Sequence, residues 1–193
     1  MKIYRAVVMG TSTGGLNALM TIIPGLPKAF PLPIMITCHR ADTSNDFMSQ
    51  HLNQRSGMSV QEPDDKQQIE AGMVYIAPPN YHLLVEQDYS LSLSVDSKVN
   101  YSRPSIDVLF ESAADAYGPD LVGVVLTGAS RDGANGVAKI VSRGGLAIVQ
   151  NPKTAESSMM PRMALEALNT VEYVLDLVDI PVLLCRLVEE NLP

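Results

Sequence analysis

The chain has 193 residues, 46% of them hydrophobic, and a formal net charge of −7. This length suits one compact domain, and no stretch reaches the ~20 apolar residues that a membrane-spanning helix needs. The acidic balance argues against nucleic acid, which proteins bind through clustered Lys and Arg. We therefore expect a single domain over residues 1–193, with no membrane insertion and, because no signal peptide is apparent, a cytoplasmic location.

Strand and helix patterns alternate along the chain. Short apolar runs that stop at glycine or proline predict strands, and apolar residues at helical spacing predict the helices that follow them. Between residues 83 and 95, apolar and polar side chains alternate in two halves, which predicts a β-hairpin. The predicted strands cover residues 3–9, 32–38, 73–77, 121–126 and 146–149, and the predicted helices cover residues 15–23, 46–53, 105–117, 133–142, 161–168 and 180–190.

This alternation predicts the fold class, a doubly wound α/β protein. Right-handed crossovers place helices on both faces of a mostly parallel sheet, and the hairpin adds a small antiparallel element. Ligands of such sheets bind beyond the carboxyl ends of the strands. Reactive residue types in the turns that follow strands are therefore the first candidates for a functional site.

The turn after the first strand, from Gly10 to Gly14, contains Ser12 in a G-x-S-x-G pattern. Such a strand-to-helix turn exposes a serine, and the free amides at the start of the next helix can stabilise an oxyanion. The same amides can instead bind a phosphate, so an anion-binding module is the alternative. Neither the G-x-G-x-x-G pattern nor a P-loop lysine is present.

The turn after the second strand begins with His39, one of three histidines. A serine hydroxyl is a poor nucleophile until a neighbouring base takes its proton, and an imidazole has a suitable pKa for this task. His51 falls within a predicted helix and His82 at the start of the hairpin, so His39 alone stands at a strand end. Cys38, the preceding residue, points to the other face of its strand and is better explained by packing.

Asp132 follows the strand over residues 121–126, in the turn from Thr127 to Ala134. It can act only as the N-cap of the helix that begins near Gly133. Alternatively, it orients His39 and stabilises the imidazolium, which would complete a Ser-His-Asp triad. The chain order Ser, His, Asp differs from that of α/β-hydrolases, but a triad is defined by its geometry.

Seven short stretches carry a resemblance to a known family. They are Val8–Gly15, Cys38-His39, Ala77-Pro78, Arg103–Phe110, Leu126-Thr127-Gly128, Asp132-Gly133-Ala134 and Met160-Pro161-Arg162. In this order and at this spacing they resemble the catalytic domain of CheB, the chemotaxis receptor methylesterase, from about Arg5 to Val178. The serine, histidine and aspartate of that family fall on Ser12, His39 and Asp132, which favours the triad over the two alternative interpretations.

The resemblance implies a serine hydrolase for γ-glutamyl methyl esters on the cytoplasmic helices of methyl-accepting chemoreceptors. Methanol is the expected product, deamidation of receptor glutamines a second activity, and no metal or cofactor is implied. A serine esterase or amidase with other substrates is a further alternative. Family members usually carry an N-terminal receiver domain, which this sequence lacks before its first strand. If Met1 is the native start, we expect constitutive activity or control by a separate receiver-domain protein.

Four further residues are candidates through the resemblance. Thr13 and the backbone amide of Ala129 match positions associated with the oxyanion or with substrate positioning. Arg103 either lines the substrate cleft or is a surface cation beside a helix, and the polar segment over residues 101–104 can form an active-site loop. Met160 is predicted to border the cleft, although a methionine is more often used for packing.

Overall fold

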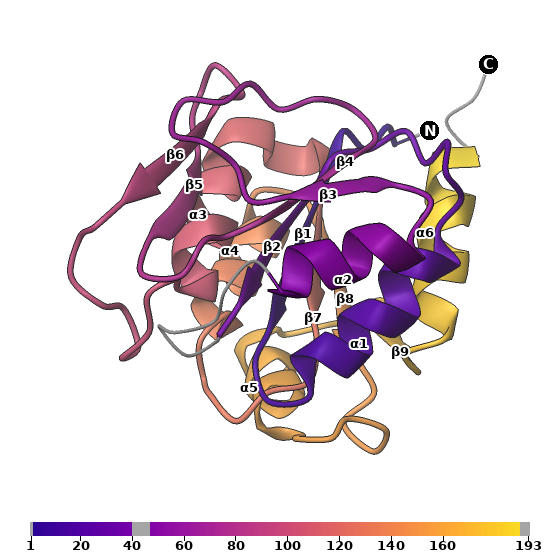
Figure 1. Ribbon diagram of the computed structural model, residues 1–193. Helices are drawn as coiled ribbons and strands as arrows, with labels where there is room; N and C mark the ends of the chain where they lie inside the picture. The colour runs from indigo at the N-terminus through magenta and orange to yellow at the C-terminus, as the bar shows by residue number, and fades with distance from the viewer. Residues whose placement is uncertain (1, 40–46, 190–193) are drawn as a thin grey trace.

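The computed structural model describes residues 2–39 and 47–189 and contains a seven-stranded parallel sheet between two layers of helices (Figure 1). The strand order is β3-β4-β2-β1-β7-β8-β9, so the chain winds outward from β1 in both directions. The strands of this sheet are β1 (Ala6–Thr11), β2 (Ile34–Cys38), β3 (Ser59–Gln61), β4 (Met73–Ile76), β7 (Leu121–Val125), β8 (Leu146–Gln150) and β9 (Tyr173–Leu175). The predicted doubly wound α/β class is confirmed.

Six α-helices and an antiparallel hairpin lie among the described residues. The helices are α1 (Gly15–Ile22), α2 (Phe47–Arg55), α3 (Ile106–Tyr117), α4 (Ala134–Ser142), α5 (Met159–Ala167) and α6 (Asp179–Glu189), and short 3-10 turns cover Ile23–Gly25 and Gly118–Asp120. The hairpin pairs β5 (His82–Val85) with β6 (Leu91–Ser94), as the alternating pattern predicts.

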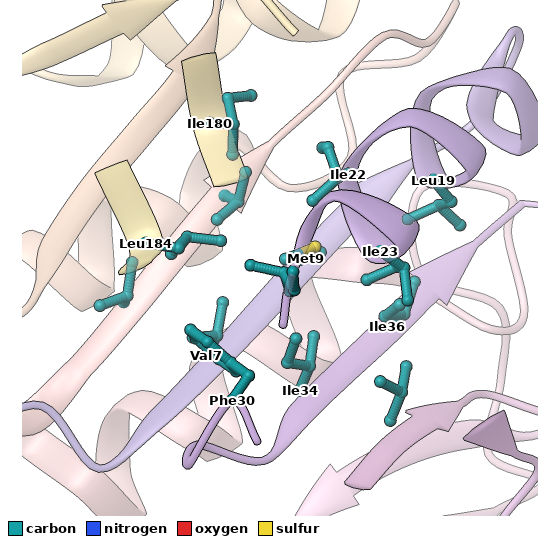
Figure 2. Packing of buried hydrophobic residues seen from close by; sticks show 14 of the residues in the cluster. Val7, Met9, Leu19, Ile22, Ile23, Phe30, Ile34, Ile36, Ile180 and Leu184 are labelled. Atoms are coloured by element: carbon teal, nitrogen blue, oxygen red, sulfur yellow. The ribbon is translucent and has the colours of Figure 1, made fainter. Parts of the chain in front are cut away.

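The central strands are apolar along their whole length because both of their faces are buried. In β1, Val7 and Met9 point into one core with α1 and α6, and Figure 2 shows them packed with Ile22 of α1 and Ile180 of α6. Ala6 and Val8 point into the opposite core, which α3, α4, α5 and the hairpin cover. The alternation of side chains along β1 therefore supplies both cores.

Most boundaries agree with the sequence patterns to within about three residues. The first strand begins at Ala6 rather than at Ile3, whose side chain is 57% exposed. The predicted helices over residues 46–53 and 180–190 correspond to α2 and α6, whereas residues 46 and 190 themselves lie outside the described residues. β3 and β9 escaped prediction because three residues at the edge of a sheet are too few for a periodic pattern.

Gly10 allows α3 to approach β1 directly behind the turn that carries Ser12. A Cβ atom at Gly10 would lie 2.3 Å from Ile106 Cγ2 and 3.2 Å from two further Ile106 carbons. A Cβ atom at Gly123, in β7, would instead lie 2.5 Å from the terminal Cδ1 of Ile140, which a change of rotamer can move. The two glycines therefore make the same kind of close contact, but the neighbouring atom is rigid at Gly10 and movable at Gly123.

We expect the substitution Gly10→Ala to lower the free energy of unfolding by about 1–3 kcal/mol, because Ile106 can withdraw only if α3 shifts. Gly123→Ala serves as the matched control and should cost less. Urea unfolding followed by circular dichroism measures both. Equal losses for the two variants would contradict this account of the contact.

Candidate active site

Three turns meet where the parallel strands β2, β1 and β7 end. Thr11 is paired with Cys38 across β1 and β2, and Gly10 is paired with Val125 across β1 and β7. Hydrogen bonds continue this ladder into the turns, since the His39 amide donates to the Thr11 carbonyl over 3.0 Å and the Ser12 amide donates to the Thr127 carbonyl over 3.0 Å. The sheet register therefore places these turns next to each other.

Ser12 lies at a sharp bend between β1 and α1. Gly14 occupies the N-cap position with a left-handed φ of 78°, which a residue with a side chain rarely adopts. The Thr127 hydroxyl donates to the Thr13 carbonyl over 2.9 Å, and the Thr11 hydroxyl donates to the Thr127 carbonyl over 2.9 Å. These bonds fix the turn after β1 against the turn after β7, with the half-buried Ser12 side chain at a pocket.

This pocket has a volume of about 400 Å³ and opens at the strand ends. It is lined by Ser12, His39, Asn100, Tyr101, Ser102, Ala129, Ser130 and Arg131. The polar segment predicted as an active-site loop thus contributes Tyr101 and Ser102. Among the described residues, no hydrogen bond joins the Ser12 hydroxyl to His39, although both side chains face the same space.

His39 forms a hydrogen bond with Asp132, whose Oδ2 lies 2.8 Å from the imidazole Nε2. A carboxylate only accepts, so Nε2 donates its proton, and in the neutral form of the ring Nδ1 then keeps its lone pair. The sequence separates the two residues by 93 positions. An imidazole with a fixed tautomer and an unprotonated nitrogen is suited to act as a general base.

Asp132 is a buried carboxylate whose oxygens are filled by donors. Besides His39, its donors are Asn100 Nδ2 (2.9 Å), Ser105 Oγ (2.8 Å) and the amides of Ile106 (2.6 Å) and Asp107 (3.1 Å). Burial alone would raise the pKa of Asp132, but the hydrogen bonds from His39, Asn100 and the two amides outweigh it and lower the pKa below its ordinary value. The carboxylate is therefore held as an anion.

The capping interpretation of Asp132 needs a correction. The N-cap position of α4 is Gly133, and the Asp132 carboxylate does not cap that helix. It accepts instead from Ile106 and Asp107, the first two residues of α3. Asp132 thus caps a helix that lies 25 residues earlier in the chain while it also contacts His39.

The other candidates lie at different distances from the pocket. Ala129 lines it, and Thr13 is exposed on the turn beside it. Within the described residues, the amides of Thr13 and Ala129 donate no hydrogen bond and remain available. Arg103 and Met160 are not among the lining residues: Arg103 Nη1 donates to the Val95 and Asp96 carbonyls, and Met160 is 1% exposed and packs against Gly128.

The two remaining histidines have structural surroundings. His82 is buried, its Nδ1 accepts from the Ser105 amide, and its Nε2 donates to the Ser97 carbonyl. His51 stacks on Phe47 at 5.2 Å. Across residues 2–39 and 47–189, no group of three or more potential metal ligands lies together. Nor does that part of the chain contain a helix long and apolar enough to cross a membrane.

A serine, an imidazole paired with a buried carboxylate, and unused amides are the groups that serine hydrolases employ. The family model described as CheB methylesterase matches residues 7–184. This chain belongs to the CheB methylesterase family.

Three comparisons place the chain within the family. A Leptospira interrogans protein, provisionally named protein-glutamate methylesterase/protein-glutamine glutaminase, is 50% identical over 189 residues, which are 98% of this chain and 97% of that protein. A Thermotoga maritima protein with the same two activities in its name is 35% identical over 95% of this chain but only 54% of its own length. The crystal structure of the Thermotoga maritima CheB methylesterase catalytic domain matches with a TM-score of 0.91 and 34% identity over 95% of this chain and 98% of that one.

Acidification should remove the contribution of Asp132 to stability. Its pKa is lower in the folded protein than the ordinary value of 3.8, so the stabilisation is present above that value and is lost as the pH falls through the folded pKa. We expect Asp132→Asn to cost about 1–3 kcal/mol at neutral pH. Urea unfolding of both proteins at a series of pH values should show this difference shrinking once the pH falls below the ordinary value of 3.8. A difference that stays constant would contradict the prediction.

Proposed function

We propose that this protein hydrolyses glutamate γ-methyl esters on the cytoplasmic helices of chemoreceptors, releases methanol, and deamidates receptor glutamines as a second activity. The observation that carries the proposal is the 2.8 Å contact between His39 and Asp132 beside Ser12, at one pocket. The names of the relatives supply the substrate class. Residues 1–193 then act as one catalytic domain in the cytoplasm.

The proposed reaction begins at Ser12. Its Oγ attacks the ester carbonyl while His39 Nδ1 takes the hydroxyl proton, and Asp132 stabilises the imidazolium through Nε2. The imidazolium then protonates the methoxy oxygen, so that methanol leaves and an acyl-enzyme remains. Water attacks the acyl-enzyme with the same imidazole as base, and Ser12 regains its proton when the glutamate leaves. With a glutamine substrate, the leaving group is ammonia.

The oxyanion needs donors that are not already engaged. We assign this role to the amides of Thr13 and Ala129, which lie in the turns after β1 and β7 and donate no hydrogen bond within the described residues. The start of α1 adds the positive end of a helix dipole on the same side. Amide donors of this kind stabilise the tetrahedral intermediate without reorganisation.

The size of the pocket favours a substrate that presents one side chain. A helix is about 10–12 Å across and cannot enter a space of about 400 Å³, whereas an extended glutamyl ester can. The receptor helix would therefore lie across the opening, against exposed residues such as Tyr101, Ala129 and Arg131. A separate receiver-domain protein that covers this opening would be a means of control.

The substitution Ser12→Ala should reduce methanol release from methyl-labelled receptor membranes by at least about 1000-fold, because the variant has no nucleophile. Ser142→Ala, at the exposed end of α4, is the control and should retain wild-type activity. Absence of release by the wild type would refute the methylesterase proposal. Retained release in Ser12→Ala would exclude Ser12 as nucleophile.

Asp132→Asn should lower kcat by up to about 10,000-fold with little change in KM. The new amide can donate to Nε2, which would move the imidazole proton to Nδ1 and leave no base beside Ser12. Steady-state assays of methanol release from membranes of increasing receptor concentration separate the two constants. A loss confined to KM would assign Asp132 to substrate binding instead.

A further inference from the structure

Asn100 connects the carboxylate of the candidate site to a second buried carboxylate. Its Nδ2 lies 2.9 Å from Asp132 Oδ1 and 2.8 Å from Asp107 Oδ2. A side-chain amide nitrogen has two hydrogens, so each carboxylate receives one of them. We propose that Asn100 is a positioning residue, which holds Asp132 in the orientation that His39 requires by separating it from Asp107. This inference rests on the proposed function of His39 and Asp132.

Asp107 and Asp132 each cap the helix to which the other is attached. Asp132 accepts from the amides of Ile106 and Asp107 at the start of α3. Asp107 Oδ1 accepts from the amides of Gly133 (2.9 Å) and Gly136 (2.7 Å) at the start of α4. The two helix starts are therefore locked together, and the chain is fixed directly after Asp132. The second oxygen of Asp107 remains free for Asn100.

The backbone at Asn100 lies in the left-handed region, within a turn that its own hydrogen bonds close. Val99 and Ser102 exchange two hydrogen bonds, of 3.1 and 2.9 Å, around a turn in which Asn100 and Tyr101 have φ values of 49° and 63°. Asparagine tolerates this left-handed region better than most residues, whereas tyrosine does so rarely. The two hydrogen bonds from the Asn100 side chain to the carboxylates add to the backbone bonds that hold this turn.

The Asn100 amide lies between two buried carboxylates whose charges oppose each other. The pKa of Asp107 is raised, first by burial and in part by the charge of Asp132, and Asn100 opposes this shift. The same amide helps to lower the pKa of Asp132. The other titratable or charged side chains nearby are His39 directly after β2, Glu111 further along α3, and Arg131 in the pocket lining. Without Asn100, we expect the two carboxylates to bind a proton at a higher pH and Asp132 Oδ2 to turn away from Nε2.

The test replaces Asn100 with glycine, which keeps the left-handed backbone accessible. We expect kcat to fall at least about tenfold with KM nearly unchanged. In 1H–15N spectra of the imidazole groups, the signal of the His39 Nε2 proton should broaden or disappear. A folded variant with an unchanged kcat and an unchanged Nε2 proton signal would overturn the proposal, because a purely structural role would alter only stability.

Tyr101→Gly is the matched control, since it also introduces a glycine into this turn but leaves the Asn100 side chain between the two carboxylates. In Tyr101→Gly, the signal of the His39 Nε2 proton should remain as in the wild type. Loss of that signal would assign the effect to the turn backbone and refute a role of the Asn100 amide.

Asn100→Asp provides a second test that needs only unfolding curves. It puts a third carboxylate beside two others, so its stability should be lowest near neutral pH and should recover on acidification. A wild-type stability profile in Asn100→Asp would also overturn the inference.

The spectroscopic readout keeps this inference separate from the proposed function. If the wild type releases no methanol but Asn100→Gly removes the Nε2 proton signal, the methylesterase proposal fails and the positioning of Asp132 by Asn100 stands. If the wild type releases methanol and Asn100→Gly changes neither the Nε2 proton signal nor kcat, only the positioning role fails.

Discussion

The buried carboxylate of Asp132 is the interaction on which the arrangement of the site depends. One side chain holds the imidazole of His39, closes the start of α3 and accepts from Asn100 in the turn between Val99 and Ser102. These partners come from parts of the chain up to 93 residues apart. A buried anion is costly unless every oxygen is filled, so the elements that supply its donors must come together when the protein folds.

The parallel sheet brings these elements together and leaves little freedom in their positions. Because β2, β1 and β7 are neighbours in register, the residues after each strand meet at one edge, and their amides continue the ladder beyond the strands. Gly10 then lets α3 approach β1 closely enough for its start to reach Asp132. The rigid core thus fixes positions of backbone, and the hydrogen bonds of the carboxylates fix the orientation of side chains.

The sequence predicts those features that depend on local pattern. Continuous apolar runs and helical spacing locate the main strands and helices, and the ends of those strands direct attention to Ser12, His39 and Asp132. The pattern could not decide whether Asp132 caps the helix that follows it or orients His39. In the structure, Asp132 contacts His39 and caps a different helix, α3. Asn100 and Asp107 carry no local signal, because their importance arises from two helix starts that meet only in the fold.

The contacts divide the site into a fixed side and an open side. Asp132 and its donors on α3 and at Ser105 are buried. Ser12, His39 and Asn100 instead border a pocket, and no hydrogen bond joins Ser12 to His39 among the described residues. A base that is already bonded to the nucleophile is not required in the free protein, since catalytic hydrogen bonds often tighten only when substrate is bound. What must exist beforehand is the tautomer of the base, because a misplaced proton would leave no acceptor for the serine. The buried side supplies that condition, and the turn at Asn100 is where the open and fixed sides are joined.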